Sequence, residues 1–347
     1  MSTRTATTIA AESDSAVESV NKTLRAVYTD MDDVDFRAGV DRLREGGFEV
    51  DYLNTSDSAQ IMAQAPDATA LLVGYAEVTA VMMDAMPSLR IIALLSMGFN
   101  NVDIEAARER GIWVTNIPGA ATEEVATHAL ALTLSLTRGL TFYSSAVQSG
   151  QWNARDSTVP PRLSQTRLGI LGLGRIGTRL AELGGALFGE VVGYDPVLPD
   201  TPVIRQQLAA AGIRRTSLEE VRSTSTVLSL HMPLTPETEG MVDAAFLAQM
   251  PQGSYLINVS RGALIDSQAL RESVNAKHLA GAGLDVLDEE PPTVSGHPLL
   301  GNPRILITPH VAYLSDFTDA EYVRQQAQNV LSWAAQGRPD SPVLELL

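Results

Sequence analysis

The sequence predicts an α/β protein built from two successive doubly wound parallel sheets. Apolar segments of strand length alternate with helical segments along most of the chain, which is the pattern of parallel sheets covered by helices. In the second half of the chain, a glycine-rich turn joins one such strand directly to a helix. With 347 residues, the chain is long enough for two domains.

The first predicted unit has no glycine-rich turn after any of its strands. We expect its strands at residues 24–29, 48–53, 70–74, 90–95 and 112–116, and its helices at 36–44, 79–86 and 103–110. Because a phosphate-binding turn is missing, we do not expect this unit to bind the nucleotide.

The second unit begins with a strand, a glycine-rich turn and a helix. Strand 167–171 leads into Gly172, which permits the tight turn, and Gly174, which lets a diphosphate approach the backbone. Gly177 lets the helix pack close to the strand, and the free amides at the helix N-terminus attract negative charge. The arrangement predicts a Rossmann dinucleotide-binding domain. The alternative is a tight turn with a structural role alone.

The next strand of this unit ends in an acid that favours one cofactor. Strand 191–195 ends at Asp195, 18 residues after Gly177. This is close to the spacing of about 20 residues expected for a carboxylate that binds the adenosine ribose. Asp195 would repel a 2′-phosphate, and residues 196–198 provide no arginine to bind one. The predicted cofactor is therefore NAD rather than NADP.

Two further helices connect and complete the units. We expect one long helix at 122–147, followed by an irregular stretch at 150–165. Thr318 and Glu321 have the spacing of a capping box, which predicts a terminal helix at 321–335. We expect this helix to return to the first unit, so that the chain crosses between domains near Pro118 and Val311, over a cleft.

These crossings divide the chain into an interrupted domain and an inserted one. We expect a substrate-binding domain at residues 22–118 and 312–347, and an NAD-binding domain at 119–311. Residues 1–21 are rich in Ser, Thr and Ala, and we expect them to be a disordered tail.

Composition excludes several classes of partner. The formal net charge of −16 argues against nucleic acid and anionic membranes. There is no cysteine, so disulfides, thiolate catalysis and cysteine-ligated metals are excluded, and we expect no metal site. No segment reaches the roughly 18 uninterrupted apolar residues of a membrane span. We expect a cytoplasmic protein.

Three ionisable residues follow strands of the second unit, where ligands of open α/β sheets bind. Arg261 follows strand 255–260, Glu290 lies in a loop after strand 283–287, and His310 ends strand 305–309. Each alone is explained by an ordinary surface role. Together, beside a dinucleotide turn, they are a candidate catalytic set. His231 also ends a strand and is expected to line the cofactor pocket, whereas His128, in an apolar helix, is not expected to act.

Several segments resemble one family. Residues 171–177, 231–238, 258–262, 281–286 and 308–310, with 98–103 and 114–119 in the first unit, are similar in order and spacing to the D-isomer-specific 2-hydroxyacid dehydrogenases, which include phosphoglycerate dehydrogenase. The resemblance covers roughly residues 70–335. It implies a Rossmann NAD domain inserted in a flavodoxin-like substrate domain.

The resemblance also implies roles for individual residues. Arg261 binds the substrate carboxylate and keto oxygen, and His310 is the acid or base at that oxygen. Glu290 orients His310 and favours its protonated ring. Amides at Met97 and Gly98 complete the carboxylate pocket. The other residues implied to contact the cofactor are Arg175, Ile176, His231, Pro233, Thr238, Val259 and Asp285.

The resemblance leaves the substrate and one rival class open. Met97 and Asn100 differ from residues common in the family, so the substrate side chain is not identified. Pocket shape is expected to depend on Met97, Phe99, Tyr75, Trp152 and Tyr313. Residues 310–316 are similar to the C-terminal-binding-protein corepressor branch, so an NAD(H)-sensing binding protein is one alternative. A dehydrogenase acting on a phosphonate- or phosphite-type oxyanion is another. A homodimer is also implied, with helix 122–147 in its interface.

Overall fold

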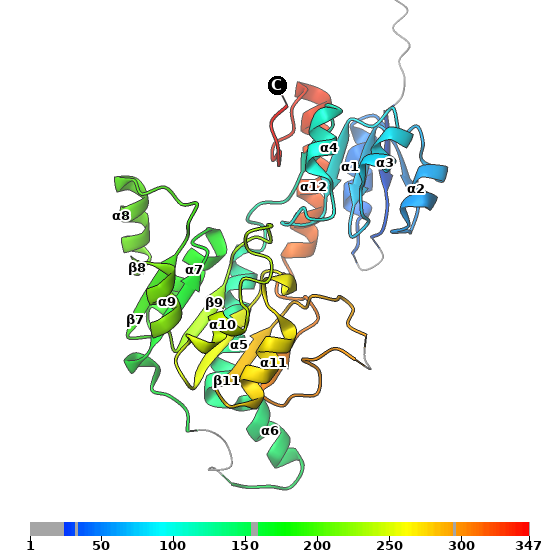
Figure 1. The fold of residues 1–347 in the computed structure, drawn as a ribbon. Coiled ribbons are helices and arrows are strands. Elements are labelled where there is room, and N and C mark those ends of the chain that lie inside the picture. Colours follow the sequence, from blue (N-terminus) through cyan, green and yellow to red (C-terminus); the bar gives the residue numbers. More distant parts are fainter. Residues whose placement is uncertain (1–23, 32–33, 154–158, 294–295, 347) are drawn as a thin grey trace, which may run out of the picture.

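The computed structural model describes residues 24–31, 34–153, 159–293 and 296–346, and it contains two parallel sheets with helices packed around each (Figure 1). The predicted tail, 1–21, lies outside the described residues. Every paired strand in both sheets runs parallel to its neighbours. This confirms the predicted fold class.

The first sheet has the strand order β2-β1-β3-β4-β5, which is the flavodoxin-like order. Its strands are β1 (Leu24–Tyr28), β2 (Phe48–Tyr52), β3 (Ala70–Val73), β4 (Ile91–Leu94) and β5 (Trp113–Thr115). The central strands β3 and β4 are buried along their whole length, as expected for a sheet covered on both faces.

Helices from both ends of the chain surround this sheet. They are α1 (Arg37–Glu45), α2 (Ser58–Gln64), α3 (Ala80–Ala85), α4 (Ile104–Glu109) and α12 (Thr318–Gln336). The sequence prediction missed α2, a short helix whose N-terminus is capped by the side chain of Asp57. Helix α12 packs on α1 and β4, and the buried Gln326 amide donates to the carbonyl oxygens of Val73 and Ala93. The terminal helix therefore returns to the first sheet.

The second sheet has the order β12-β11-β10-β9-β6-β7-β8, in which β6 and β9 lie where the strand order reverses. This is the Rossmann order with one additional strand. The strands are β6 (Arg167–Leu171), β7 (Glu190–Tyr194), β8 (Ile213–Arg215), β9 (Val227–Leu230), β10 (Ser254–Asn258), β11 (Leu279–Leu284) and β12 (Ile305–Ile307). The short strand β8 was not predicted.

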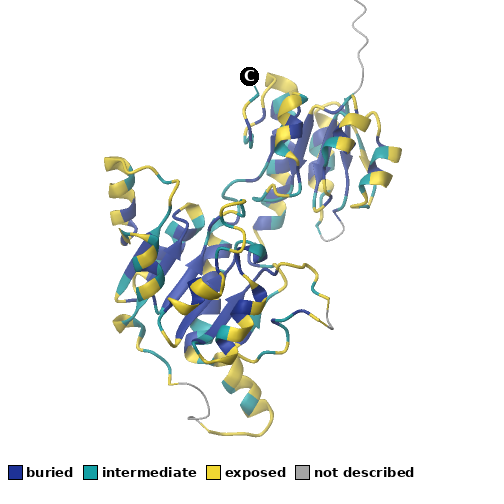
Figure 2. Ribbon diagram, viewed as in Figure 1, coloured by how far each residue is buried: buried dark blue, intermediate teal, exposed yellow. Residues whose placement is uncertain are grey.

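Helices cover both faces of the second sheet, and burial is concentrated in its strands (Figure 2). They are α5 (Thr122–Arg138), α6 (Leu140–Gln148), α7 (Arg175–Gly184), α8 (Pro202–Ala210), α9 (Leu218–Thr224), α10 (Ala244–Ala248) and α11 (Ser267–Asn275). Two short 3-10 turns lie at Leu163–Gln165 and Gly262–Leu264. Helix α5 packs on α7, β10 and β11, so the segment that enters from the first sheet becomes part of this core.

Two details of the prediction were wrong. The single helix expected at 122–147 is divided at Gly139, whose φ of 61° is left-handed and ends α5 before α6 begins. The capping box is absent, because α12 begins at Thr318 itself. The hydroxyl of Ser315 accepts hydrogen bonds from the amides of Phe317 and Thr318, while Glu321 bonds to side chains farther along the helix.

No helix in the described part of the chain is long and apolar enough to cross a membrane.

Candidate active site

The glycine-rich turn lies between β6 and α7, at the carboxyl end of the second sheet. Gly172 has a φ of 95°, and a Cβ there would lie 2.5 Å from the carbonyl oxygen of His231. A Cβ on Gly177 would overlap the carbonyl oxygen of Gly172. At Gly174, in contrast, a Cβ would meet no heavy atom within 4 Å. Gly172 and Gly177 are required by packing within the chain. Gly174 leaves open space at the N-terminus of α7, as a bound diphosphate requires.

Asp195 fastens this turn to the loop that follows β7. Its Oδ2 accepts from the amide of Leu173 at 2.9 Å, and its Oδ1 accepts from the amides of Val197 and Leu198 at 2.9 and 3.1 Å. The structure also places Arg215 here, with Nη2 donating to the carbonyl oxygens of Asp195 and Leu198 at 3.0 and 2.6 Å. Strand β8, which was not predicted, brings this arginine beside β7. Its guanidinium already bonds to the backbone.

Arg261 connects the two sheets. It follows β10, and its Nε donates to Oδ1 of Asn100 at 3.2 Å while Nη1 donates to the carbonyl oxygen of Ser260 at 2.7 Å. Nη2 lies so close to Gly98 that a Cβ there would overlap it. Within the described residues, Nη2 donates to no protein group. Burial lowers the pKa of Arg261, and the charge of Glu290 opposes this shift.

The side chains of Glu290 and His310 are hydrogen-bonded to each other. Nδ1 of His310 lies 2.6 Å from Oε2 of Glu290, whose Oε1 accepts from the amide of Leu287 at 2.8 Å. Burial alone would raise the pKa of Glu290, but the hydrogen bond and charge of His310, the Leu287 amide and the charge of Arg261 together lower it. Because Nδ1 is engaged, Nε2 is the ring nitrogen left for a ligand.

The turn that carries His310 is held by the buried Asp285. His310 has a left-handed φ of 53°, and its amide donates to the carbonyl oxygens of Asp285 and Thr308 at 2.8 and 3.0 Å. The Asp285 side chain is 1% exposed, and its Oδ1 accepts from the Thr308 hydroxyl at 2.6 Å and the Val311 amide at 3.0 Å. Its Oδ2 accepts from the Ala312 amide at 2.9 Å. Asp285 therefore holds the backbone of the turn from which the His310 side chain extends.

His128 of α5 also reaches this turn, although the sequence gave no reason to expect it. Its Nε2 lies 2.9 Å from the hydroxyl of Thr308 and 3.6 Å from Oδ1 of Asp285. The single hydroxyl proton of Thr308 is donated to Asp285, so Nε2 of His128 must be the donor to Thr308. Helix α5 is thereby tied to the turn that carries His310.

The other residues predicted to contact the cofactor or substrate have the following positions and hydrogen bonds. His231 follows β9, and its Nε2 lies 2.8 Å from the Ser229 hydroxyl. Burial lowers the pKa of His231 to about 3, so its ring is neutral. The Thr238 hydroxyl donates to the carbonyl oxygen of Pro233 at 2.8 Å. Arg175 and Ile176 begin α7, and Val259 is buried after β10. The Met97 carbonyl oxygen accepts from Nδ2 of the Asn116 side chain at 2.7 Å.

Of the residues expected to shape the pocket, Tyr313 packs against the chain whereas Trp152 is exposed. Tyr313 stacks on Tyr322 of α12, with ring centroids 5.9 Å apart. Trp152 is 89% exposed and follows α6, which projects from the second sheet on the side away from the first (Figure 1). Trp152 is therefore not brought to the candidate site of its own chain.

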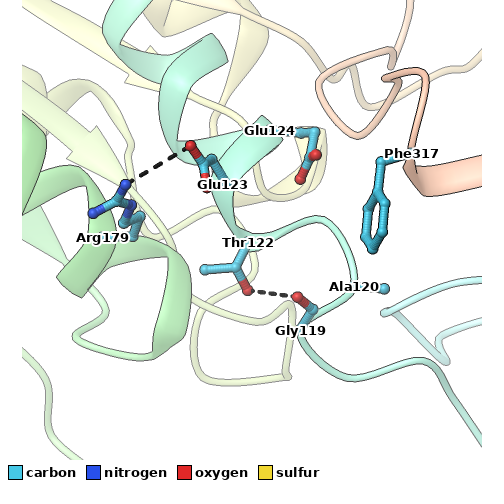
Figure 3. Close-up of a pocket in the computed structure, with 7 residues that line it drawn as sticks. All are labelled: Gly119, Ala120, Thr122, Glu123, Glu124, Arg179 and Phe317. Atoms are coloured by element: carbon cyan, nitrogen blue, oxygen red, sulfur yellow. Dashed lines mark hydrogen bonds and ion pairs between the residues drawn. The ribbon is translucent and has the colours of Figure 1, made fainter. Parts of the chain in front are cut away.

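A separate open cavity of about 440 Å³ lies where the chain crosses between the sheets (Figure 3). It is bounded by the N-terminal end of α5, by Arg179 of α7 and by Phe317. Near it, the hydroxyl of Ser315 donates to Glu124 at 3.0 Å, which joins the two crossings. No group of residues in the described part of the chain is arranged to hold a metal ion.

Comparisons with known proteins identify the family. Residues 130–312 match the sequence model of the D-isomer specific 2-hydroxyacid dehydrogenase, NAD binding domain. D-3-phosphoglycerate dehydrogenase of Mycobacterium tuberculosis (strain ATCC 25618 / H37Rv) is 36% identical over 264 residues, which are 76% of this chain and 48% of that protein. Hydroxypyruvate reductase of Blautia hydrogenotrophica is 33% identical over 76% of this chain and 81% of its own.

Solved structures agree with the sequence comparisons. The D-lactate dehydrogenase of Aquifex aeolicus, determined with NAD and lactic acid, superposes with a TM-score of 0.80 at 28% identity, covering 90% of this chain and 96% of that one. The chain therefore belongs to the D-isomer-specific 2-hydroxyacid dehydrogenase family, and residues 130–312 match its NAD-binding domain. It spans about half the length of the phosphoglycerate dehydrogenases that it matches.

The turn glycines give a first prediction. Gly177→Ala should destabilise the fold by about 1–3 kcal/mol, because the new methyl group overlaps the Gly172 carbonyl. Gly174→Ala should leave the urea unfolding midpoint unchanged and weaken NADH binding measured by calorimetry, because its methyl group meets only the open space. A Gly174→Ala protein that binds NADH as the wild type does would contradict the placement of the diphosphate.

The contact between α5 and the His310 turn gives a second prediction. His128→Leu removes the hydrogen bond to Thr308, so amide hydrogen exchange in residues 308–312 should become about tenfold faster, as for a loss of about 1.4 kcal/mol. His128→Gln should restore slow exchange, because its amide can donate to the same hydroxyl. His278→Leu is the matched control, since His278 bonds to the Leu247 carbonyl outside the site. Equal exchange in all three variants would show that His128 does not hold the turn.

Proposed function

We propose that this protein is an NAD-dependent oxidoreductase that interconverts a 2-keto acid and a D-2-hydroxy acid. The observation that carries the proposal is the convergence of Arg261, Glu290 and His310. A Cβ on Gly262 would overlap the backbone of Leu287, so the turn after Arg261 packs directly on the loop that leads to Glu290. Glu290 in turn holds His310 at 2.6 Å. A cation for a carboxylate and a proton donor for a carbonyl oxygen thus both interact electrostatically with one carboxylate, that of Glu290.

The chain's own groups suit the two tasks that this reaction gives them. NADH, when bound at the glycine turn, supplies the hydride. Arg261 binds the substrate carboxylate and keto oxygen through its free Nη2, on the side of the guanidinium that lies beside Gly98. His310 donates a proton from Nε2 to the keto oxygen as it becomes a hydroxyl, and accepts it in the opposite direction. Glu290 stabilises the protonated ring through Nδ1.

The remaining site residues belong to the same proposal. We assign the diphosphate to Gly172, Gly174 and Gly177 with Arg175 and Ile176, and the adenosine ribose to Asp195. The other assigned cofactor contacts are His231, Pro233, Thr238, Val259 and Asp285, and Met97 and Gly98 are assigned to the substrate. The corresponding division is a substrate domain at 22–118 and 312–347 around an NAD domain at 119–311. We also place this cysteine-free protein in the cytoplasm.

Two alternatives differ in their use of the site. A binding protein that senses NAD(H) needs none of the three convergent side chains, so the presence of Arg261 beside the hydrogen-bonded Glu290 and His310 favours catalysis. A phosphonate- or phosphite-type oxyanion could also bind to Arg261. Partner capture that depends on NADH, without turnover of any keto acid, would favour the sensor.

We further propose a homodimer in which α6 contributes to the interface. Helix α6 has no buried residue, and its Leu140, Phe142 and Val147 are 57%, 37% and 48% exposed. An apolar helix that projects in this way is typical of a subunit contact. The dimer would bury α6 and the neighbouring Trp152.

Kinetics of two variants test the catalytic proposal. NADH oxidation should be followed with a panel of 2-keto acids. Arg261→Ala should lower kcat/KM by about 10²–10³, because a charged bidentate contact in the transition state is lost. His310→Ala should lower kcat by about 10²–10⁴, because proton transfer is lost. Arg205→Ala is the control, since Arg205 lies on α8 and pairs with Asp200. Wild-type turnover in both site variants would refute the assignment.

Light scattering tests the dimer. The wild type should have twice the 37.1 kDa mass of one chain, and Phe142→Asp should shift it towards the monomer, because a charge would be buried in the interface. Val81→Asp, at a 69% exposed position on α3, should leave the mass unchanged. A wild type that is monomeric at all concentrations would remove the proposal.

A further inference from the structure

The loops that follow β3 and β4 form one wall beside Arg261. The amide of Val78 donates to the Asn101 carbonyl at 2.8 Å, and the Asn101 side chain donates to the Ala76 carbonyl at 3.0 Å. Residues 74–79 and 95–103 are therefore hydrogen-bonded to each other. The second of these loops carries Gly98 and Asn100, which contact the Arg261 guanidinium. The wall thus lies against the group that would bind the substrate carboxylate.

Aromatic side chains are exposed on this wall. Tyr75 is 68% exposed and Phe99 is 40% exposed. The backbone under Tyr75 is fixed, because Asp30 accepts from the amides of Gly74 and Tyr75 at 3.2 and 2.6 Å. A wall of this kind presents ring surface to the part of a substrate that extends away from its carboxylate.

The charge of this edge is negative. The segments that follow the strands of the first sheet are 29–36, 53–57, 74–79, 95–103 and 116–121, and none of them contains lysine or arginine. Among the described residues of these segments, the charged side chains are the acids Asp30, Asp35, Asp57, Glu77 and Asp103. The described residues of these segments therefore offer no cation to a second anionic group on the substrate, whereas an uncharged group needs none.

We propose that the substrate carries one anionic group, the carboxylate held by Arg261, and that its side chain is uncharged and apolar or aromatic. This rests on the proposed function and specifies its substrate class. Tyr75 and Phe99 are the residues that select the side chain, through ring contacts of the kind that favour aromatic and aliphatic groups. Phosphorylated and dicarboxylic keto acids need a second cation, which the described residues of these segments do not supply.

The test compares substrates that differ in the charge of the side chain. Phenylpyruvate and 4-methyl-2-oxopentanoate should have kcat/KM values at least tenfold above those of oxaloacetate and phosphohydroxypyruvate, with NADH as the reductant. Tyr75→Arg adds a cation to the wall and should raise kcat/KM for oxaloacetate, relative to phenylpyruvate, at least tenfold. Tyr75→Phe keeps the ring and is the matched control, so its order of preference should be that of the wild type.

The outcomes separate this inference from the proposed function. Turnover that depends on Arg261 but prefers a dicarboxylic or phosphorylated acid would overturn the inference and leave the dehydrogenase standing. If no keto acid is turned over, a binding measurement still tests the inference. In it, D-phenyllactate and D-malate are titrated calorimetrically into the protein with NADH. Tighter binding of D-phenyllactate without any turnover would support the inference and refute the enzyme. Equal or absent binding of both acids would overturn the inference.

Discussion

The hydrogen bonding of one buried carboxylate, that of Asp285, holds the candidate site together. A buried charge is stable only when it is fully hydrogen-bonded, and Asp285 receives the Thr308 hydroxyl and the amides of Val311 and Ala312. These bonds hold a turn in which His310 has a left-handed φ, a conformation that costs a non-glycine residue about 1–2 kcal/mol. The end of β11 and the turn that carries His310 are therefore joined by hydrogen bonds to one side chain.

The site is assembled from two sheets that each contribute a different part. The second sheet supplies the charged groups, because the carboxyl ends of its parallel strands meet at the edge that carries the glycine turn. The first sheet supplies backbone and aromatic surface through Gly98, Asn100 and the loop of Tyr75. Arg261 contacts both, so the relative position of the sheets determines the shape of the space around its guanidinium.

The sequence predicted the parts of the site that depend on local pattern. The glycine turn and the strand-end positions of Arg261 and His310 follow from short motifs and from strand periodicity. The contact of His128 could not be predicted, because its partner Thr308 lies 180 residues away in the sequence. Strand β8, which carries Arg215, was not predicted because its three residues have no clear alternation. The break at Gly139 was missed because apolar residues continue on both sides, and a left-handed φ leaves no periodic signal.

The return of α12 to the first sheet has a consequence for the order in which the chain is made. The face of the first sheet that includes Tyr28, Leu72 and Ala93 is completed by Ala327 and Val330 of α12. The ribosome synthesises this helix after the whole second sheet. All strands of the second sheet, from β6 to β12, are therefore synthesised before the last helix of the first sheet. In most multidomain proteins, by contrast, the N-terminal domain is complete first and folds first. Until α12 is released, the part of this face that Ala327 and Val330 cover lacks its packing partners.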